Sequence, residues 1–133
     1  MQRYSPARRT LSLLIIATSF GLTELGAAAT CTIYSDRDYK GSHWTLRNGD
    51  DMKMIDPPQL GTSDGIHRFL YEPSWNDKVS SFKVDPGCTL TLWEHVNNGG
   101  HHFRSNRSYL YVGARWNDKA SEAICECAGL PNW

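Results

Sequence analysis

Short segments that alternate hydrophobic and polar residues fill the chain after about residue 30, and turn residues separate them. Alternation of this kind over about four to eight residues is typical of half-buried β-strands. The pattern predicts strands at Cys31–Tyr34, Gly41–Arg47, Val79–Val84, Thr89–Glu94, His101–Arg104, Tyr109–Val112 and Ala120–Cys127. No stretch repeats hydrophobic residues at helical spacing for three turns, so helix should be limited to a turn or so. The pattern therefore predicts an all-β protein, and short strands at this spacing indicate a sandwich of two sheets.

The N-terminal segment 1–29 differs from the rest of the chain. Three arginines precede an apolar run from Leu11 to Leu22, and Ala27–Ala29 then offers small residues for cleavage. We interpret 1–29 as a signal peptide and 30–133 as one mature domain. The apolar run is too short and too often interrupted to span a bilayer of about 30 Å, and no other segment approaches the roughly 20 apolar residues of a membrane helix. The sequence thus predicts a secreted protein without a membrane span, extracellular or, in a Gram-negative host, periplasmic.

Charge and cysteine content narrow the class further. The chain has 14 Lys plus Arg and 14 Asp plus Glu. Loss of the signal peptide removes three Arg and one Glu, which leaves a net charge of 11 − 13 = −2 for the mature chain. This balance argues against nucleic acid as a partner. The mature part holds Cys31, Cys88, Cys125 and Cys127, and an even number behind an export signal indicates two disulfides. A zinc site is disfavoured because only the last two cysteines are close in sequence and no CxxC or HxxxH spacing accompanies them.

The mature chain also repeats itself. Thr32–Tyr34 matches Thr91–Trp93 at a numbering offset of 59, and Trp75–Lys78 recurs as Trp116–Lys119 at an offset of 41. The difference between the two offsets, 59 − 41 = 18, places an insertion of that length in the first copy. We expect it in Asn48 to Ile66, where paired aspartates, paired prolines and a glycine indicate an irregular loop.

Two signatures within these repeats resemble those of the βγ-crystallin superfamily, specifically its secreted single-domain microbial members. The folded hairpin signature, aromatic, four residues, aromatic, any residue, glycine, stands here as Tyr34, Tyr39 and Gly41. The calcium motif Asn/Asp, Asn/Asp, two variable residues, Ser/Thr, Ser is intact in Asn76–Ser81. The resemblance covers Cys31 to Cys127 and implies a two-sheet Greek-key β-sandwich, a monomer built from two motifs at about 31–86 and 88–128.

The second copy departs from the family pattern at two positions. Trp93 and Gly100 are in place in its hairpin, but Asn98 stands where the first copy has Tyr39. The second calcium motif, Asn117–Glu122, ends in glutamate instead of serine. The resemblance makes that serine a structural residue more than a direct ligand, so it leaves the competence of the second site open.

The resemblance implies two calcium sites shared between the motifs. Calcium takes about six to eight oxygen ligands, and Asn, Asp and Ser side chains supply them. The family also uses a hairpin carbonyl just after the first aromatic residue, which corresponds to Ser35 and Glu94 here. The full set of candidate ligands is Ser35, Asn76, Asp77, Ser80, Glu94, Asn117, Asp118 and Ser121. The alternative is that these Asn, Asp and Ser residues only form turns by bonding their own backbone.

The resemblance also implies a disulfide pattern. In the family's Greek key the first and last strands of a motif run side by side in opposite directions. Cys88 should therefore pair with Cys125 or Cys127, and Cys31 should take the remaining cysteine.

No enzyme is expected. The chain has no GxSxG elbow, and no two of its acids stand out for glycoside hydrolysis. We expect solvent-exposed histidines at His43, His67, His95, His101 and His102, and core aromatics instead of a sugar-stacking face at Trp44, Trp75, Trp93, Trp116, Tyr34 and Tyr39. The resemblance implies a calcium-binding protein whose ion stabilises the fold. The alternatives are an extracellular protease inhibitor or killer-toxin-like antimicrobial protein on the same fold, or a cell-wall carbohydrate binder with a protein or glycan partner.

Overall fold

A computed structural model describes residues 28–59 and 64–128 of the chain. The predicted signal peptide falls almost entirely on residues 1–27, outside the described residues. Among the described residues, no helix is long and apolar enough to cross a membrane.

The described residues form eight strands and two short 3-10 turns. These are β1 (Thr30–Asp36), η1 (Arg37–Tyr39), β2 (Lys40–Arg47), β3 (Asp50–Lys53), β4 (Arg68–Tyr71), η2 (Pro73–Trp75), β5 (Ser81–Val84), β6 (Cys88–His95), β7 (Gly99–Ser105) and β8 (Glu122–Cys127). The predicted all-β class is confirmed. The expected strand at Tyr109–Val112 is reduced to an isolated bridge between Tyr109 and Phe82, whereas β3 and β4 were not expected.

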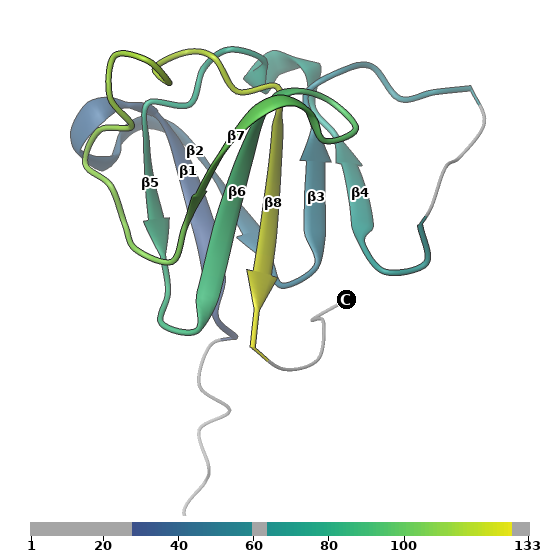
Figure 1. The fold of residues 1–133 in the computed structure, drawn as a ribbon, viewed down its shortest axis with the longest axis horizontal. Coiled ribbons are helices and arrows are strands. Elements are labelled where there is room, and N and C mark those ends of the chain that lie inside the picture. Colours follow the sequence, from purple (N-terminus) through teal and green to yellow (C-terminus); the bar gives the residue numbers. More distant parts are fainter. Residues whose placement is uncertain (1–27, 60–63, 129–133) are drawn as a thin grey trace, which may run out of the picture.

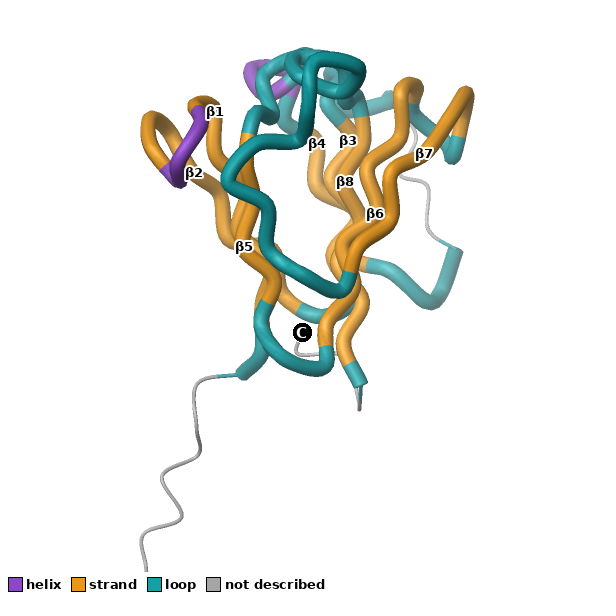
Figure 2. Tube along the Cα trace, turned by 60° about the vertical axis from the view of Figure 1, so that its left-hand side comes forward, coloured by secondary structure: helices purple, strands orange, loops and turns teal. Residues whose placement is uncertain are grey.

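The strands make two sheets that face each other (Figures 1 and 2). One sheet has the order β2-β1-β5 and the other has the order β4-β3-β8-β6-β7. All neighbouring strands are antiparallel except β3 and β4. β3 belongs to the first half of the chain but pairs with β8 of the second half. In the same way, Tyr109 of the second half pairs with Phe82 of β5 in the first half. This reciprocal exchange is the Greek-key arrangement, and it joins the two halves into one unit.

The core lies between the sheets. Its largest fully buried apolar side chains are Phe82, Ile33, Leu46, Met52, Met54, Leu90, Leu92 and Val79. Trp75 and Trp116 are in the core as predicted, and Trp44 packs against it. Tyr34, Tyr39 and Trp93 are only half-buried, so the prediction that they fill the core is wrong. In β1 the side chain of Ile33 faces the core, and alternation therefore directs that of Tyr34 to the outer face, where its ring contacts Tyr39.

The insertion of the first copy lies later than the sequence suggested. Asp50–Lys53 is the buried strand β3, not part of a loop. The inserted chain follows it and includes β4, which runs parallel to β3. Asp50, one of the two aspartates that indicated a loop, is buried with a partner: the Arg68 guanidinium donates two hydrogen bonds of 2.7 Å to it.

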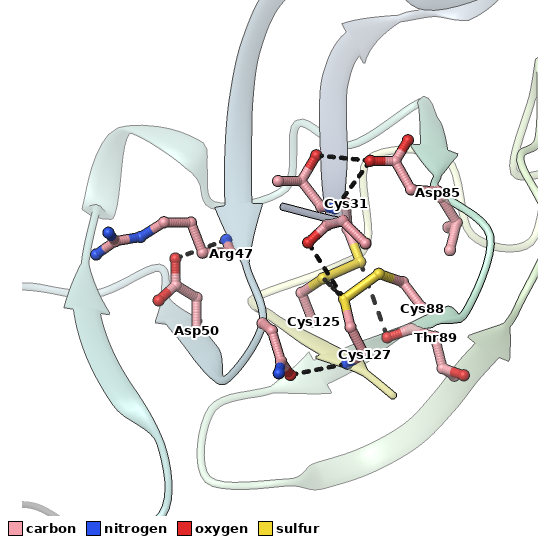
Figure 3. Close-up of a disulfide and its surroundings, with 12 residues drawn as sticks. Cys31, Arg47, Asp50, Asp85, Cys88, Thr89, Cys125 and Cys127 are labelled. Atoms are coloured by element: carbon pink, nitrogen blue, oxygen red, sulfur yellow. Dashed lines mark hydrogen bonds between the residues drawn. A yellow bond between two sulfur atoms is a disulfide. The ribbon is translucent and has the colours of Figure 1, made fainter. Parts of the chain in front are cut away.

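Two disulfides close one end of the sandwich (Figure 3). Cys31 of β1 is bonded to Cys125, with Cα atoms 5.9 Å apart. Cys88 of β6 is bonded to Cys127, its direct cross-strand partner on β8, with Cα atoms 3.8 Å apart. The prediction that Cys88 and Cys31 each pair with one of the two C-terminal cysteines is confirmed, and the structure decides between the two alternatives. The described part of the chain has no free cysteine.

Candidate metal centre

The two calcium-motif segments lie at the end of the sandwich opposite the disulfides, above the strands in Figure 1. We call them the first Asn-Asp segment (Asn76–Ser81) and the second Asn-Asp segment (Asn117–Glu122). Each follows a buried tryptophan, Trp75 or Trp116, whose indole is in the core. The tryptophans fix where each segment leaves the sandwich.

The two segments are bonded to each other through their backbones. Asp77 and Asp118 both have φ of 57°, a left-handed conformation that Asn and Asp adopt more readily than most residues. The Asp77 N–H donates to the carbonyl of Ala120 at 3.0 Å, and the Asp118 N–H donates to the carbonyl of Val79 at 3.3 Å. Each turn is therefore held against the other copy and does not stand alone.

The first oxygen cluster joins the first hairpin, Ser80 and the second segment. The Ser80 N–H donates to the carbonyl of Tyr34 at 3.0 Å, which places Ser80 beside the hairpin at Ser35. The Ser80 hydroxyl donates to Asp118 Oδ1 at 3.3 Å. Three predicted ligands, Ser35, Ser80 and Asp118, are thus brought to one place from three distant parts of the chain.

The second oxygen cluster lies in the other half and differs from the first in using an asparagine in place of the aspartate. The Ser121 N–H donates to the carbonyl of Trp93 at 2.9 Å, next to Glu94. The Ser121 hydroxyl donates to Asn76 Oδ1 at 2.6 Å. The cluster therefore contains Glu94, Ser121 and Asn76, so both copies contribute to it.

The side chains of Ser35 and Glu94 are occupied inside their own hairpins. Ser35 Oγ accepts a 2.9 Å hydrogen bond from the N–H of Ser42. Glu94 Oε1 accepts hydrogen bonds from the N–H of His101 at 3.1 Å and from its Nδ1 at 2.6 Å, and the side-chain bond lowers the pKa of Glu94. These two residues can thus offer their backbone carbonyls to a cation, as the resemblance implies.

Asp77 and Asp118 carry carboxylates that lack a counter-charge. Each accepts a hydrogen bond from the amide of the preceding asparagine, at 3.3 Å from Asn76 and 3.1 Å from Asn117. Both aspartates are exposed, and among the described residues neither forms an ion pair. Carboxylate, amide, hydroxyl and carbonyl oxygens together form the donor set that suits calcium. These residues therefore carry the type of donor atom that calcium prefers, and their role as ligands stays a prediction.

A buried charged cluster next to the second oxygen cluster was missed by sequence reasoning. Lys53 Nζ lies 3.4 Å from Asp51 Oδ2 and 3.5 Å from Glu122 Oε1, and the three side chains are 0–7% exposed. Burial and then the charge of Glu122 raise the pKa of Asp51 to about 7, although Lys53 opposes this. The only signal in the sequence was the glutamate that ends the second motif.

The expectation of an exposed side chain is wrong for one histidine. The His67 side chain is 18% exposed, with Nδ1 2.6 Å from Asp64 Oδ2 and Nε2 3.3 Å from Glu126 Oε1. Burial acts to lower the pKa of His67, but the hydrogen bonds to the two carboxylates outweigh it and raise the pKa. His67 therefore connects the part of the insertion just before β4 to β8.

Comparisons with known proteins agree with this architecture. The sequence profile of peptidase inhibitor family I36 matches residues 28–105. A βγ-crystallin domain from Clostridium beijerinckii is similar in structure, with a TM-score of 0.55 and 27% identity over 73% of this chain and 97% of that one. A βγ-crystallin domain from Flavobacterium johnsoniae has a TM-score of 0.55 and 26% identity over 74% of this chain and 96% of that one.

The N-terminal domain of protein S is similar in fold alone, with a TM-score of 0.55 and 22% identity over 77% of this chain and 100% of that one. No curated protein matches the sequence. The resemblance to βγ-crystallins and the Greek-key sandwich expected from it are confirmed.

Proposed function

The chain belongs to peptidase inhibitor family I36, and we propose that it acts as an exported, non-enzymatic calcium-binding domain whose ions hold the two motifs together. The observation that supports this proposal is the reciprocal contact between the motifs. Ser80 of the first motif meets Asp118 of the second, and Ser121 of the second meets Asn76 of the first. An ion in either cluster would therefore bind both motifs at once.

The two ends of the sandwich differ in how they are closed. Covalent bonds join the strands at the disulfide end, whereas hydrogen bonds between polar groups join the two segments at the opposite end. Hydrogen bonds that water can replace contribute only about 1 kcal/mol each to stability. A divalent cation held by carboxylate, amide and carbonyl oxygens would act as a much stronger link at this end. Because the oxygens converge only in the folded chain, the ion would stabilise folding.

Calcium should measurably raise the melting temperature of the oxidised mature protein. At a concentration 100 times its Kd, a ligand of the folded state adds about 2.7 kcal/mol. One kcal/mol shifts the melting temperature of a domain of about 100 residues by roughly 4–8 °C, so a rise of more than about 10 °C is expected over a chelator control. Identical melting curves in excess calcium and in chelator would contradict the proposal.

Peptidase inhibition is the second candidate, and family membership favours it. A surface loop that blocks a peptidase needs exposed side chains on a rigid support, because pre-organisation reduces the entropy lost on binding. The insertion has both features. Ile55 and Ile66 are 39% and 65% exposed, while Arg68 is hydrogen-bonded to Asp50 and His67 to Glu126.

Inhibition is tested on a panel of extracellular serine, cysteine and metallopeptidases. If the insertion makes the contact, Ile55→Asp and Ile66→Asp should each weaken inhibition about tenfold or more. Leu110→Asp is the matched control, since Leu110 is 56% exposed but lies outside the insertion. Inhibition of none of the peptidases would reject this candidate, and an equal loss in the Leu110 variant would place the contact elsewhere.

A further inference from the structure

We propose that Glu122 is a positioning residue for the second calcium site: it replaces the motif's serine as the anchor of the second hairpin and links this anchor to β3 through Lys53. The inference rests on the proposed calcium function. It reverses the simplest interpretation of Glu122, in which a glutamate at the serine position damages the site.

The first motif shows what the final serine does. Ser81 is fully buried, and its Oγ accepts a 3.1 Å hydrogen bond from the N–H of Tyr39. The same hydroxyl donates to the carbonyl of Asp36. Ser81 thereby fastens the folded hairpin between β1 and β2 to β5, but it does not take part in the first oxygen cluster.

The second motif keeps this contact with different residues. By the repeat offsets of 41 and 59, Glu122 corresponds to Ser81 and Asn98 corresponds to Tyr39. Glu122 Oε2 accepts a 3.3 Å hydrogen bond from the N–H of Asn98. The two departures from the family pattern are therefore one coordinated change, in which a longer anchor reaches a hairpin that has lost its second aromatic ring.

The second carboxylate oxygen of Glu122 has a partner that serine could not reach. Glu122 Oε1 lies 3.5 Å from Lys53 Nζ, and the Glu122 side chain is fully buried. The N–H of Met54 also donates to the carbonyl of Ser121 at 2.9 Å. One glutamate thus joins β3, the strand before the insertion, to the hairpin of the other motif, and a charged hydrogen-bonded link in a buried site is hard to replace by water.

Two of the three proposed ligands of the second cluster, Ser121 and Glu94, depend on this link. Ser121 directly precedes Glu122 at the start of β8, and its N–H bonds the carbonyl of Trp93. Glu94 follows Trp93 in the hairpin whose tip contains Asn98. If Glu122 releases Asn98, the hairpin carbonyl and the Ser121 hydroxyl lose their fixed separation, and the affinity for calcium should fall.

The two interpretations predict opposite effects of restoring the family residue. If Glu122 damages the site, Glu122→Ser should tighten calcium binding at the second site. If Glu122 is the anchor, Glu122→Ser should weaken it about tenfold and leave the first site unchanged. Glu122→Gln is the matched control, because its side-chain carbonyl can still accept the hydrogen bond of Asn98, and its second-site affinity should stay within about threefold of the wild type.

Amide hydrogen exchange in metal-free protein tests the anchor without calcium. We expect exchange at Asn98 to accelerate at least tenfold in Glu122→Ser and to change little in Glu122→Gln. The Tyr39 amide, held by Ser81, is the internal control for an intact fold and should stay protected in both variants. If Glu122→Ser does not fold, Glu122→Asp, shorter by one methylene group, is measured in the same way with the same expectations.

The outcomes separate this inference from the calcium proposal. Unchanged exchange at Asn98, or tighter calcium binding in Glu122→Ser, would overturn the role of Glu122. Faster exchange at Asn98 in a chain whose wild type binds no calcium would instead reject the calcium function, and with it a positioning role at a metal site. Faster exchange together with weaker second-site binding supports the inference.

Discussion

Replacement of Lys53 by methionine should destabilise the protein by an amount that grows with pH. Lys53 is the only cation within 4 Å of Asp51 and Glu122 among the described residues, and all three side chains are almost completely buried. Methionine keeps the length and the apolar stem but removes the charge. Removing one partner of a buried ion pair typically costs about 3–5 kcal/mol, because the remaining charge has no compensation.

The pH dependence follows from the proton on Asp51. Burial and Glu122 raise its folded-state pKa to about 7 from 3.8. The folded chain therefore binds this proton more tightly than the unfolded chain between those values. Its contribution to stability declines as pH rises through this window and is level above pH 7. Without Lys53 the pKa of Asp51 should move above 7, so the free energy of unfolding of the variant keeps declining above pH 7. Its difference from wild type should widen there by about 1.4 kcal/mol per pH unit.

Urea unfolding followed by tryptophan fluorescence at pH 5, 7, 8 and 9 measures this gap. Lys40→Met is the control, since Lys40 is exposed at the start of β2, and its free energy of unfolding should differ from wild type by a small amount that does not change with pH. The gap for Lys53→Met should be smallest at pH 5 and largest at pH 9. A gap that is constant across the series would refute the argument that the cation balances two buried carboxylates.

Three further perturbations test other parts of the structure. Replacing both cysteines of a disulfide by alanine should lower the free energy of unfolding by about 5 kcal/mol for Cys31–Cys125 and about 4 kcal/mol for Cys88–Cys127. The longer loop costs more because the entropy that a disulfide removes from the unfolded chain grows with the sequence separation, 94 against 39 residues. Urea unfolding that reverses this order would contradict the estimate. Gly41→Ala and Gly100→Ala should each lower stability by about 1–2 kcal/mol, since both glycines have positive φ, and unchanged melting curves would show that the hairpins adapt. The pKa of His67 is raised in the folded chain because the carboxylate hydrogen bonds outweigh burial, so its contribution to stability is complete below its unfolded pKa of about 6.5 and is lost as pH rises through its folded pKa. His67→Gln should therefore flatten the dependence of stability on pH above about pH 6.5. An unaltered dependence would exclude this role.

The hairpins and the disulfides could be predicted from sequence because their signals are local or repeated. Strand alternation places Ile33 in the core, and the numbering offset of 59 identifies the second hairpin as a copy of the first. The family's strand order excludes a bond between Cys31 and Cys88, and the structure shows which of Cys125 and Cys127 each of them takes.

β3 could not be predicted because its charges are paired over long distances. Asp50 is bonded to Arg68, 18 residues away, and Lys53 contacts Glu122, 69 residues away. Without those partners, a segment with two adjacent aspartates is typical of a turn. The insertion was consequently placed too early, and β4 was missed.

The candidate ligands were found by motif, but their grouping needed the structure. The sequence shows two similar segments, and only the fold shows that Ser80 meets Asp118 while Ser121 meets Asn76. The role of Glu122 was not visible for the same reason. Only the structure shows that Glu122 accepts a hydrogen bond from the N–H of Asn98. In the motif alone, Glu122 is a departure from the family's serine.

Calorimetric titration of calcium into the oxidised mature chain shows whether the two oxygen clusters bind the ion and how many ions each chain takes. We expect two ions per chain, and one ion in each of Ser80→Arg and Ser121→Arg, because the introduced cation occupies one oxygen cluster and leaves the other intact. The absence of binding heat at millimolar calcium, or two ions still bound by both arginine variants, would contradict this expectation.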